Sequence, residues 1–302
     1  VVLEEGERSD WWRRRAVTLR RETRRPLRRI RVPRETARHG RDDDLARLHA
    51  LHERAKAGDG RVLLVEGEAG IGKTRLIDEL AGRLRESGED VAFLYGSYAP
   101  GGAATASSAF AEALREHFGA AGLEDALRSH LTVTPLLVPA FAALLRGDAT
   151  PTGAEPLTKD SLQTVLVRTV HGLAEERPTI VWIDDLHFAP ADGRALFTSL
   201  ALAVPEHRIL LAGTMRPGVP EEWTASITRL DHAEQRSLSR LGLEDFSALL
   251  KDAFRSERLA HELGMKIAEK SDGNPFFAFE IIRGLREGQF ISQQPDGTWV
   301  TT

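Results

Sequence analysis

A stretch of eight residues, 67–74, constrains this chain more than any other. It reads Gly-Glu-Ala-Gly-Ile-Gly-Lys-Thr and matches the pattern G-x-x-x-x-G-K-[ST] at every fixed position. The apolar run 61–65 precedes it and is typical of a buried parallel strand. Residues 73–86 follow, with apolar side chains at helical spacing. A strand, a glycine-rich turn and a helix N-terminus therefore meet at a predicted anion-binding site.

Each part of this stretch has a role in holding a nucleoside triphosphate. Backbone N–H groups converge at the helix N-terminus, where the helix dipole adds positive charge. Lys73 is expected to reach the β- and γ-phosphates, and the Thr74 hydroxyl to ligate Mg²⁺. The alternative is a chance glycine-rich turn, which the flanking strand and helix disfavour. The predicted nucleotide-binding residues here are Gly67, Glu68, Ala69, Gly70, Ile71, Gly72, Lys73, Thr74 and Arg75.

Residues 179–185 form the second informative stretch, an apolar run that ends in two carboxylates. Parallel sheets place ligands at the carboxyl ends of such strands. Asp184 is predicted to hold Mg²⁺ through water, and Asp185 to orient or polarise the attacking water. Two solvated acids at the start of a loop are the alternative. The phosphate-binding motif upstream favours the catalytic interpretation.

A third apolar run, 208–214, leads to Thr214 and Arg216. At the same sheet edge, Arg216 could stabilise charge in the transition state or sense the γ-phosphate. A surface arginine before a proline turn is an equally ordinary interpretation. The predicted catalytic residues are Lys73, Asp184, Asp185 and Arg216.

Charge is distributed unevenly along the chain. Residues 1–41 contain 14 arginines and six acidic residues, a surplus of +8, so with a total charge of −4 the remaining residues carry −12. Residues 1–37, interrupted by Pro26 and Pro33, are expected to form a basic arm or linker. Such a segment can contact nucleic acid, although we favour the interpretation as a solvated linker or as a helix that lies on the acidic body.

The composition of the chain limits the chemistry and the location that we expect for it. The chain contains no cysteine, which excludes disulfides and thiolate chemistry and fits a cytoplasmic location. No stretch is long and apolar enough to cross a membrane, and the ten histidines lack metal-ligand spacing. Because the chain begins with Val1 rather than methionine, we expect it to be part of a longer polypeptide.

The rest of the chain predicts alternating helices and strands. A strand is expected at 91–95 and another at 236–238, and a hairpin at 289–301 around Asp296-Gly297. Residues 147–156, with two prolines and two glycines, are expected to form an exposed loop. Helices are predicted at 42–57, in segments of 105–146, and at 160–176, 243–254, 259–271 and 275–288.

Taken together, the motifs resemble those of the STAND ATPases, signal-transduction ATPases with numerous domains, over residues 38–302. The bacterial branch found in large LuxR-type regulators and in kinase or cyclase fusions is the most similar. The resemblance lies in residues 40–41, 67–74, 182–189 and 273–277 and in Thr214 with Arg216. The chain departs from the family by reading Arg-Asp-Asp-Asp after Gly40 and by placing Phe188 where tryptophan is usual.

The resemblance implies an α/β fold with a defined architecture. It predicts a P-loop core with five parallel strands in the order 5-1-4-3-2, flanked by helices, and then a helical lid and a winged helix. The implied domains are a core at 38–241, a lid at 242–288 and the start of a winged helix, cut short, at 289–302. It also implies Arg41 near the nucleotide, Pro275 against the adenine and Arg216 as the sensor of the γ-phosphate.

The resemblance further implies a slow ATPase that acts as a switch. ADP would hold a closed monomer, and ATP with Mg²⁺ would open it and permit self-association. Sensor and effector domains would then lie elsewhere in the same polypeptide. Two other functions stay open, namely a AAA-type motor that remodels protein or nucleic acid, and a nucleic-acid-binding ATPase that uses the basic arm.

Overall fold

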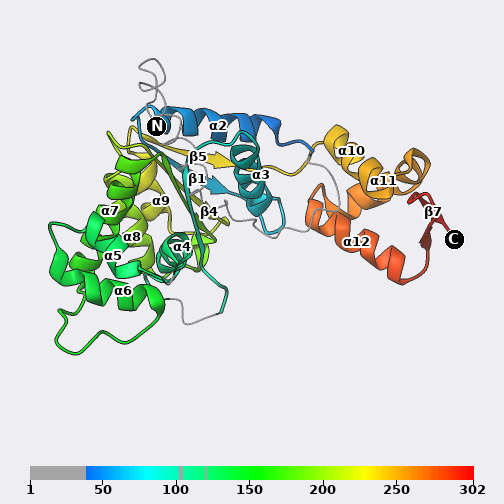
Figure 1. Ribbon diagram of the computed structural model, residues 1–302. Helices are drawn as coiled ribbons and strands as arrows, with labels where there is room; N and C mark the ends of the chain where they lie inside the picture. The colour runs from blue at the N-terminus through cyan, green and yellow to red at the C-terminus, as the bar shows by residue number, and fades with distance from the viewer. Residues whose placement is uncertain (1–38, 102–104, 120) are drawn as a thin grey trace, which may run out of the picture.

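The computed structural model describes residues 39–101, 105–119 and 121–302, and a parallel five-stranded sheet lies at its centre (Figure 1). The strand order is β2-β3-β4-β1-β5, which confirms the predicted order 5-1-4-3-2. The predicted arm, 1–37, lies outside the described residues. The strands are β1 (Arg61–Glu66), β2 (Ala92–Ser97), β3 (Thr179–Asp184), β4 (Ile209–Met215) and β5 (Ala233–Ser237).

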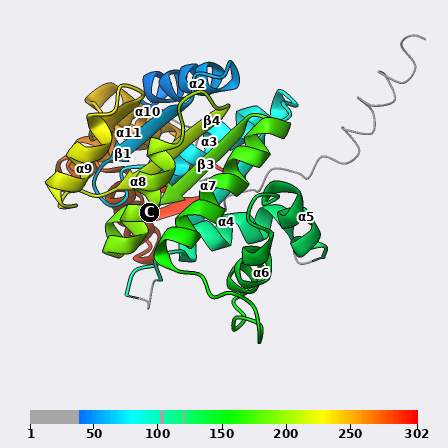
Figure 2. The same ribbon diagram turned by 90° about the vertical axis from the view of Figure 1, so that its left-hand side faces the viewer.

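Alternating side chains of the strands feed two separate apolar cores. In β1, Val62 and Leu64 join one core, whereas Leu63 and Val65 join the other. Both faces of the sheet are therefore covered, as the continuous apolar runs predicted. On one face lie α2 (Asp42–Lys56) and α3 (Lys73–Glu86), which pack their leucines onto the sheet (Figure 2).

The opposite face of the sheet is covered by the helices that lie between β2 and β5 in the chain. Helix α7 begins where predicted, because Thr158 and Ser161 cap each other across its first turn. Among the described residues, no helix combines the length and the apolar composition that crossing a membrane requires. The elements of this layer are α4 (Ser108–Phe118), α5 (Leu123–His130), η1 (Pro135–Leu137), α6 (Val138–Arg146), α7 (Lys159–Glu176), η2 (Leu186–Phe188), α8 (Ala191–Leu202) and α9 (Glu221–Thr228).

The last helices form a small bundle beside the sheet (Figure 1). Helices α10 (Leu243–Phe254), α11 (Glu257–Ser271) and α12 (Pro275–Glu287) share an apolar core of their own, and we call these three helices the lid. Strands β6 (Ile291–Gln293) and β7 (Trp299–Thr301) then pair antiparallel, so the predicted hairpin is present. The winged helix to which this hairpin was assigned stays a prediction.

One strand differs from its predicted position. Strand β5 runs from Ala233 to Ser237 rather than over 236–238. Its sequence, Ala-Glu-Gln-Arg-Ser, is polar because β5 is an edge strand that pairs only with β1 and leaves one side to solvent. Apolar periodicity therefore could not reveal it.

Candidate nucleotide-binding site

The loop between β1 and α3 has the backbone that a phosphate-binding loop requires. Gly70 and Gly72 both adopt positive φ, at 74° and 107°, which a residue with a Cβ rarely does. Helix α3 starts at Lys73 and has no acidic residue in its first turn. The positive end of the helix dipole therefore points into the loop, and the first turn of α3 itself contributes no carboxylate to neutralise it.

The Lys73 side chain lies folded inside this loop. Its ammonium donates hydrogen bonds of 2.9 Å to the carbonyl oxygens of Gly67 and Glu68, and the residue is buried. Burial lowers the Lys73 pKa, and the nearby carboxylates of Asp185 and Asp184 oppose that effect. The structure thus places the predicted phosphate lysine beside both predicted acids.

Asp184, at the end of β3, is surrounded by hydroxyl groups. Thr74 Oγ1 and Tyr95 Oη donate to Asp184 Oδ2 at 3.0 and 3.1 Å. Thr214 Oγ1 donates to Asp184 Oδ1. Since the Thr74 proton is directed at the carboxylate, the lone pairs of its oxygen can face a cation. Hydroxyl and carboxylate oxygens are ligands that suit Mg²⁺, so these residues fit the cation that the motif implies.

Asp185 follows in an unusual conformation. Its φ is 58°, in the left-handed region, and its backbone N–H donates to Thr214 Oγ1 at 3.0 Å. Burial raises the Asp185 pKa, and the neighbouring Asp184 adds to this effect, while Lys73 and Arg216 oppose it. Thr214 Oγ1 therefore binds both acids, because it donates to the side chain of Asp184 and accepts from the backbone N–H of Asp185. The predicted polar residue at the end of β4 acts as a link between them.

His187 is a further member of the cluster. Its Nδ1 lies 3.7 Å from Asp185 Oδ1, and neither ring nitrogen, both buried, has a hydrogen-bond partner among the described residues. Burial lowers the His187 pKa to about 4, helped by the positive charges of Arg216 and Lys73. Arg216 also lies over the ring of Phe188, with its guanidinium carbon 5.5 Å from the ring centroid. All four predicted catalytic residues, including Arg216, thus lie in one electrostatically coupled group.

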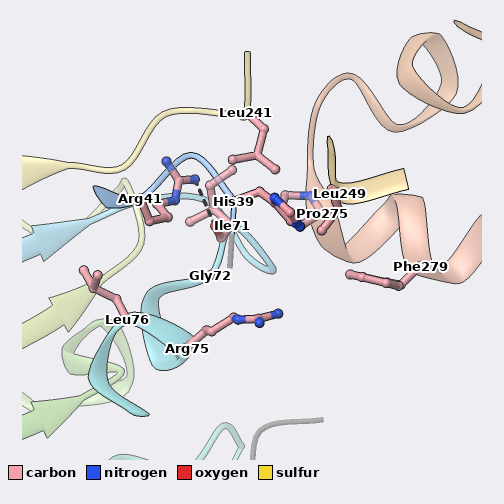
Figure 3. A pocket seen from close by; sticks show the side chains of 10 residues that line it. All are labelled: His39, Arg41, Ile71, Gly72, Arg75, Leu76, Leu241, Leu249, Pro275 and Phe279. Carbon is pink, nitrogen blue, oxygen red and sulfur yellow. Dashed lines mark hydrogen bonds between the residues drawn. The ribbon is translucent and has the colours of Figure 1, made fainter. Parts of the chain in front are cut away.

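A narrow apolar pocket lies between the loop and the lid (Figure 3). Its volume is about 50 Å³. Arg41, expected near the nucleotide, and Pro275, expected against the adenine, line it from opposite sides. Its lining residues are His39, Arg41, Ile71, Gly72, Arg75, Leu76, Leu241, Leu249, Pro275 and Phe279.

Arg41 joins the pocket wall to the loop. Its Nη2 donates to the carbonyl oxygens of Ile71 and Ser239, at 3.1 and 2.6 Å. Burial lowers the Arg41 pKa, and the carboxylates of Asp44 and Asp245 oppose that effect. Since Asp245 belongs to α10, Arg41 links the loop to the lid electrostatically as well as by position.

The lid contacts the phosphate-binding loop directly. Asn274 caps α12, where its Oδ1 accepts from the Phe276 backbone N–H at 3.1 Å, and its Nδ2 donates to Ala69 O at 3.0 Å. Phe276 lies so close to Gly70 that a Cβ at Gly70 would be 2.3 Å from the Phe276 Cβ. The tip of the loop is therefore packed against the first turn of α12.

An ion-pair bridge repeats this connection at the surface. The Arg240 guanidinium binds the Glu68 carboxylate at 3.0 Å and also pairs with Asp272 at the end of α11. Glu68 was predicted only as a member of the loop. Its side chain joins the loop to the lid instead of facing the phosphate site.

The sequence did not identify Tyr95, Arg240 or the loop contact of Asn274 as members of this site. Tyr95 had a usable signal, because it lies near the end of β2, and β2 neighbours β3 in the expected strand order. Asn274 was named only as part of the family-like segment 273–277. Its second contact depends on where the lid lies, which no local pattern encodes.

Outside this site, one histidine does lie beside two carboxylates. His49, Glu53 and Glu89 are close enough to share an ion, contrary to the expectation from histidine spacing. Glu89 comes from the turn after α3, so linear spacing could not reveal it. Lys56 occupies both carboxylates, at 3.1 Å from Glu53 and 3.3 Å from Glu89. The cluster is therefore a charge-paired surface between α2 and that turn.

Comparison with known proteins agrees with this architecture. An uncharacterised protein of Rhizobium meliloti (strain 1021) is 27% identical over an alignment of 281 residues that covers 85% of this chain and 25% of that protein. The chain thus spans about a quarter of the length of this curated relative.

Two solved structures share the fold. The Walker-type ATPase PABY2304 of Pyrococcus abyssi has a TM-score of 0.52 at 17% identity, over 89% of this chain and 72% of that one. The Drosophila ORC bound to DNA has a TM-score of 0.50 at 11% identity, over 95% and 62%. At these identities the likeness concerns the fold alone.

The family match covers the loop and both acids. The family described as AAA ATPase domain matches residues 39–212, more than half of the chain, from the pocket wall at His39 through Lys73 and Asp185 into β4. The chain belongs to the AAA ATPase domain family.

Proposed function

We propose that this chain is the nucleotide-operated core of a STAND-type signalling switch, which binds ATP or ADP with Mg²⁺ and hydrolyses ATP slowly. The hydrogen bond from Asn274 Nδ2 to Ala69 O carries the proposal. It joins the lid to the loop that would hold the phosphates. The identity of the ligand in the loop would thereby affect the position of the lid.

Each site residue would have its own role in binding the nucleotide and hydrolysing ATP. Lys73 would exchange its two loop carbonyls for phosphate oxygens, while the loop N–H groups hold the same phosphates. Thr74 and Asp184 would hold Mg²⁺, which when bound neutralises phosphate charge. Asp185 would orient the attacking water, and Arg216 would face the γ-phosphate from the other side.

Hydrolysis is expected to be slow because no hydrogen bond from the described residues fixes the direction of the Asp185 carboxylate. Its backbone is held in the left-handed region, and its carboxylate stands 3.7 Å from His187, beyond hydrogen-bond distance. A water-orienting residue works best when its own partners fix it. A slow reaction is what a switch requires, since its state must outlast the signal.

The lid would respond because two nucleotides can favour two lid positions. A ligand shifts an equilibrium only by its difference in affinity for the two states. ADP and ATP carry the same base, so the difference must come from the γ-phosphate, which only ATP brings to the loop. That phosphate would move the lid and strain or break the contact of Asn274 with Ala69, which ADP would leave in place.

In this proposal ADP holds a closed monomer, and ATP opens the lid and exposes a surface for self-association. The output would lie in other parts of the same polypeptide. The length of the Rhizobium meliloti relative, about four times the matched region, supports this arrangement.

The proposal is tested by amide hydrogen exchange and solution mass with ADP·Mg²⁺ and with a non-hydrolysable ATP analogue. We expect ADP to protect α10–α12 and the analogue to expose them and increase the mass. Lys73→Ala serves as the control and should respond to neither nucleotide. The switch is ruled out if both nucleotides bind while lid exchange and mass stay the same.

Two other results would replace the proposal with the alternatives. Rapid ATP turnover that a protein or nucleic-acid substrate accelerates would indicate a remodelling motor. Nucleic-acid binding that falls steeply with salt and disappears on removal of residues 1–37 would indicate a nucleic-acid-binding ATPase.

A further inference from the structure

Tyr95 brings a phenol group to the predicted cation site from a neighbouring strand. Strands β2 and β3 pair in parallel, with Ser97 opposite Asp184 and Tyr95 opposite Trp182. From that position the Tyr95 hydroxyl reaches Asp184 Oδ2 at 3.1 Å. Burial raises the Tyr95 pKa, and the charge of Asp184 raises it further, so the phenol keeps its proton and acts as a donor.

The acceptor capacity of Asp184 is nearly filled by protein hydroxyls. A carboxylate offers about four lone-pair positions. Thr74 and Tyr95 take both positions of Oδ2, and Thr214 takes one of Oδ1. A single position on Oδ1 is left to accept from a water bound to the cation. The three hydroxyls therefore fix both the rotation of the carboxylate and the direction of its remaining lone pair.

We propose that Tyr95 is a positioning residue for the nucleotide-bound divalent cation, acting through the carboxylate of Asp184. This inference rests on the proposed function, since the cation arrives with the nucleotide. Of the three hydroxyls, Thr74 would also ligate the cation and Thr214 also binds the backbone of Asp185. The Tyr95 hydroxyl bonds Asp184 Oδ2 without being an expected ligand of the cation, so its removal tests the positioning effect.

The chain supplies a matched control. It contains two tyrosines, Tyr95 and Tyr98. The Tyr98 hydroxyl donates to the backbone carbonyl of Ala106 at 2.7 Å and has no contact with either acid. Tyr95→Phe and Tyr98→Phe thus remove the same atom from two nearby sites, Tyr95 half-buried and Tyr98 buried. Of the two hydroxyls, only that of Tyr95 bonds the Asp184 carboxylate, whereas Tyr98 reaches Asp184 through its backbone N–H, which the substitution keeps.

The experiment measures ADP affinity by calorimetry with saturating Mg²⁺ and again with EDTA, and Mn²⁺ binding to the ADP complex by electron paramagnetic resonance. Partners of metal-bound groups typically change metal affinity by about 10- to 100-fold. For Tyr95→Phe we expect Mn²⁺ binding to weaken by about 10-fold. ADP affinity in EDTA should equal that of the wild type, which also shows that the variant is folded.

Tyr98→Phe should bind Mn²⁺ as the wild type does. In that variant Tyr95 is the sole tyrosine, so adding Mg²⁺ to its ADP complex should perturb the ultraviolet absorption of tyrosine. Equal Mn²⁺ affinity in both variants would overturn the inference. Absence of ADP binding by the wild type in EDTA and in Mg²⁺ would overturn the proposed function instead.

Discussion

The side-chain amide of Asn274 donates a hydrogen bond to the carbonyl oxygen of Ala69, 205 positions earlier in the chain, at 3.0 Å. The same side chain caps α12 through its oxygen. One residue thereby starts a lid helix and fixes that helix to the phosphate-binding loop. In the proposed switch, this contact would couple nucleotide binding at the loop to the position of the lid.

Asn274→Asp separates the two roles of this side chain. Aspartate keeps the oxygen that caps α12 but loses the N–H donor to Ala69. We expect faster hydrogen exchange in α12 and faster ADP release, with little change in the bundle itself. Ser256→Ala is the control, since it removes the cap of α11, worth about 1 kcal/mol, far from the loop. Equal ADP release rates in the two variants would count against the coupling.

Gly70→Ala tests the packing of the loop against the lid. A Cβ there would lie 2.3 Å from the Phe276 Cβ, so the lid must move. Gly147→Ala is matched in backbone, with φ of 81° against 74°, and its Cβ would meet nothing within 4 Å. Both should lose about 1–2 kcal/mol through backbone strain. Only Gly70→Ala should increase exchange in α12; equal exchange would contradict the packing argument.

Asp185→Asn is expected to stabilise the protein while stopping hydrolysis. The Asp185 pKa is raised in the fold, so its ionised form is disfavoured there and destabilises the protein at pH values above that raised pKa. Asparagine removes this penalty, which we place at about 1 kcal/mol or less, or about 2–4 °C in Tm. The gain should be present at pH 8 and shrink toward pH 4. Calorimetric melting across this range checks it, and a Tm that falls at pH 8 would contradict it.

The lowered pKa of His187 leads us to expect that the protein loses stability in mild acid. Its pKa is about 4 in the fold, against 6.5 for an unperturbed histidine, so the unfolded chain binds the proton more readily. Stability should therefore fall by about 1–2 kcal/mol as the pH drops from 6.5 to 4, since solvent screening reduces the full effect of the shift. His187→Gln should remove this part of the pH dependence, as urea unfolding at several pH values would show. His261→Gln, at an exposed position of α11, should leave the dependence as in the wild type.

The sequence was sufficient for features that depend on neighbours in the chain. Helix α3 begins at Lys73 and α12 at Pro275, as predicted, because a glycine-rich turn and an asparagine cap mark their starts. The sheet order came from the family resemblance, and the apolar runs then located the central strands. The bounds of the polar edge strand β5 were predicted wrongly because this strand lacks an apolar pattern.

Contacts between distant segments could not be predicted in the same way. Tyr95 reaches Asp184 only in the register in which β2 pairs with β3. Arg240 bridges Glu68 and Asp272 only when the lid lies against the loop. Each contact depends on packing over long separations in sequence. The expected strand order places Tyr95 near Asp184, but residue type and spacing give neither the register of the strands nor the position of the lid.

The most direct test of the account is the nucleotide content of the freshly purified protein, determined by denaturing it and separating the supernatant by chromatography. The account predicts nearly one ADP per chain, and none in Lys73→Ala, whose loop lacks the ammonium that would bind the phosphates. A site that holds neither ADP nor ATP, and that takes up neither when they are added with Mg²⁺, would contradict it.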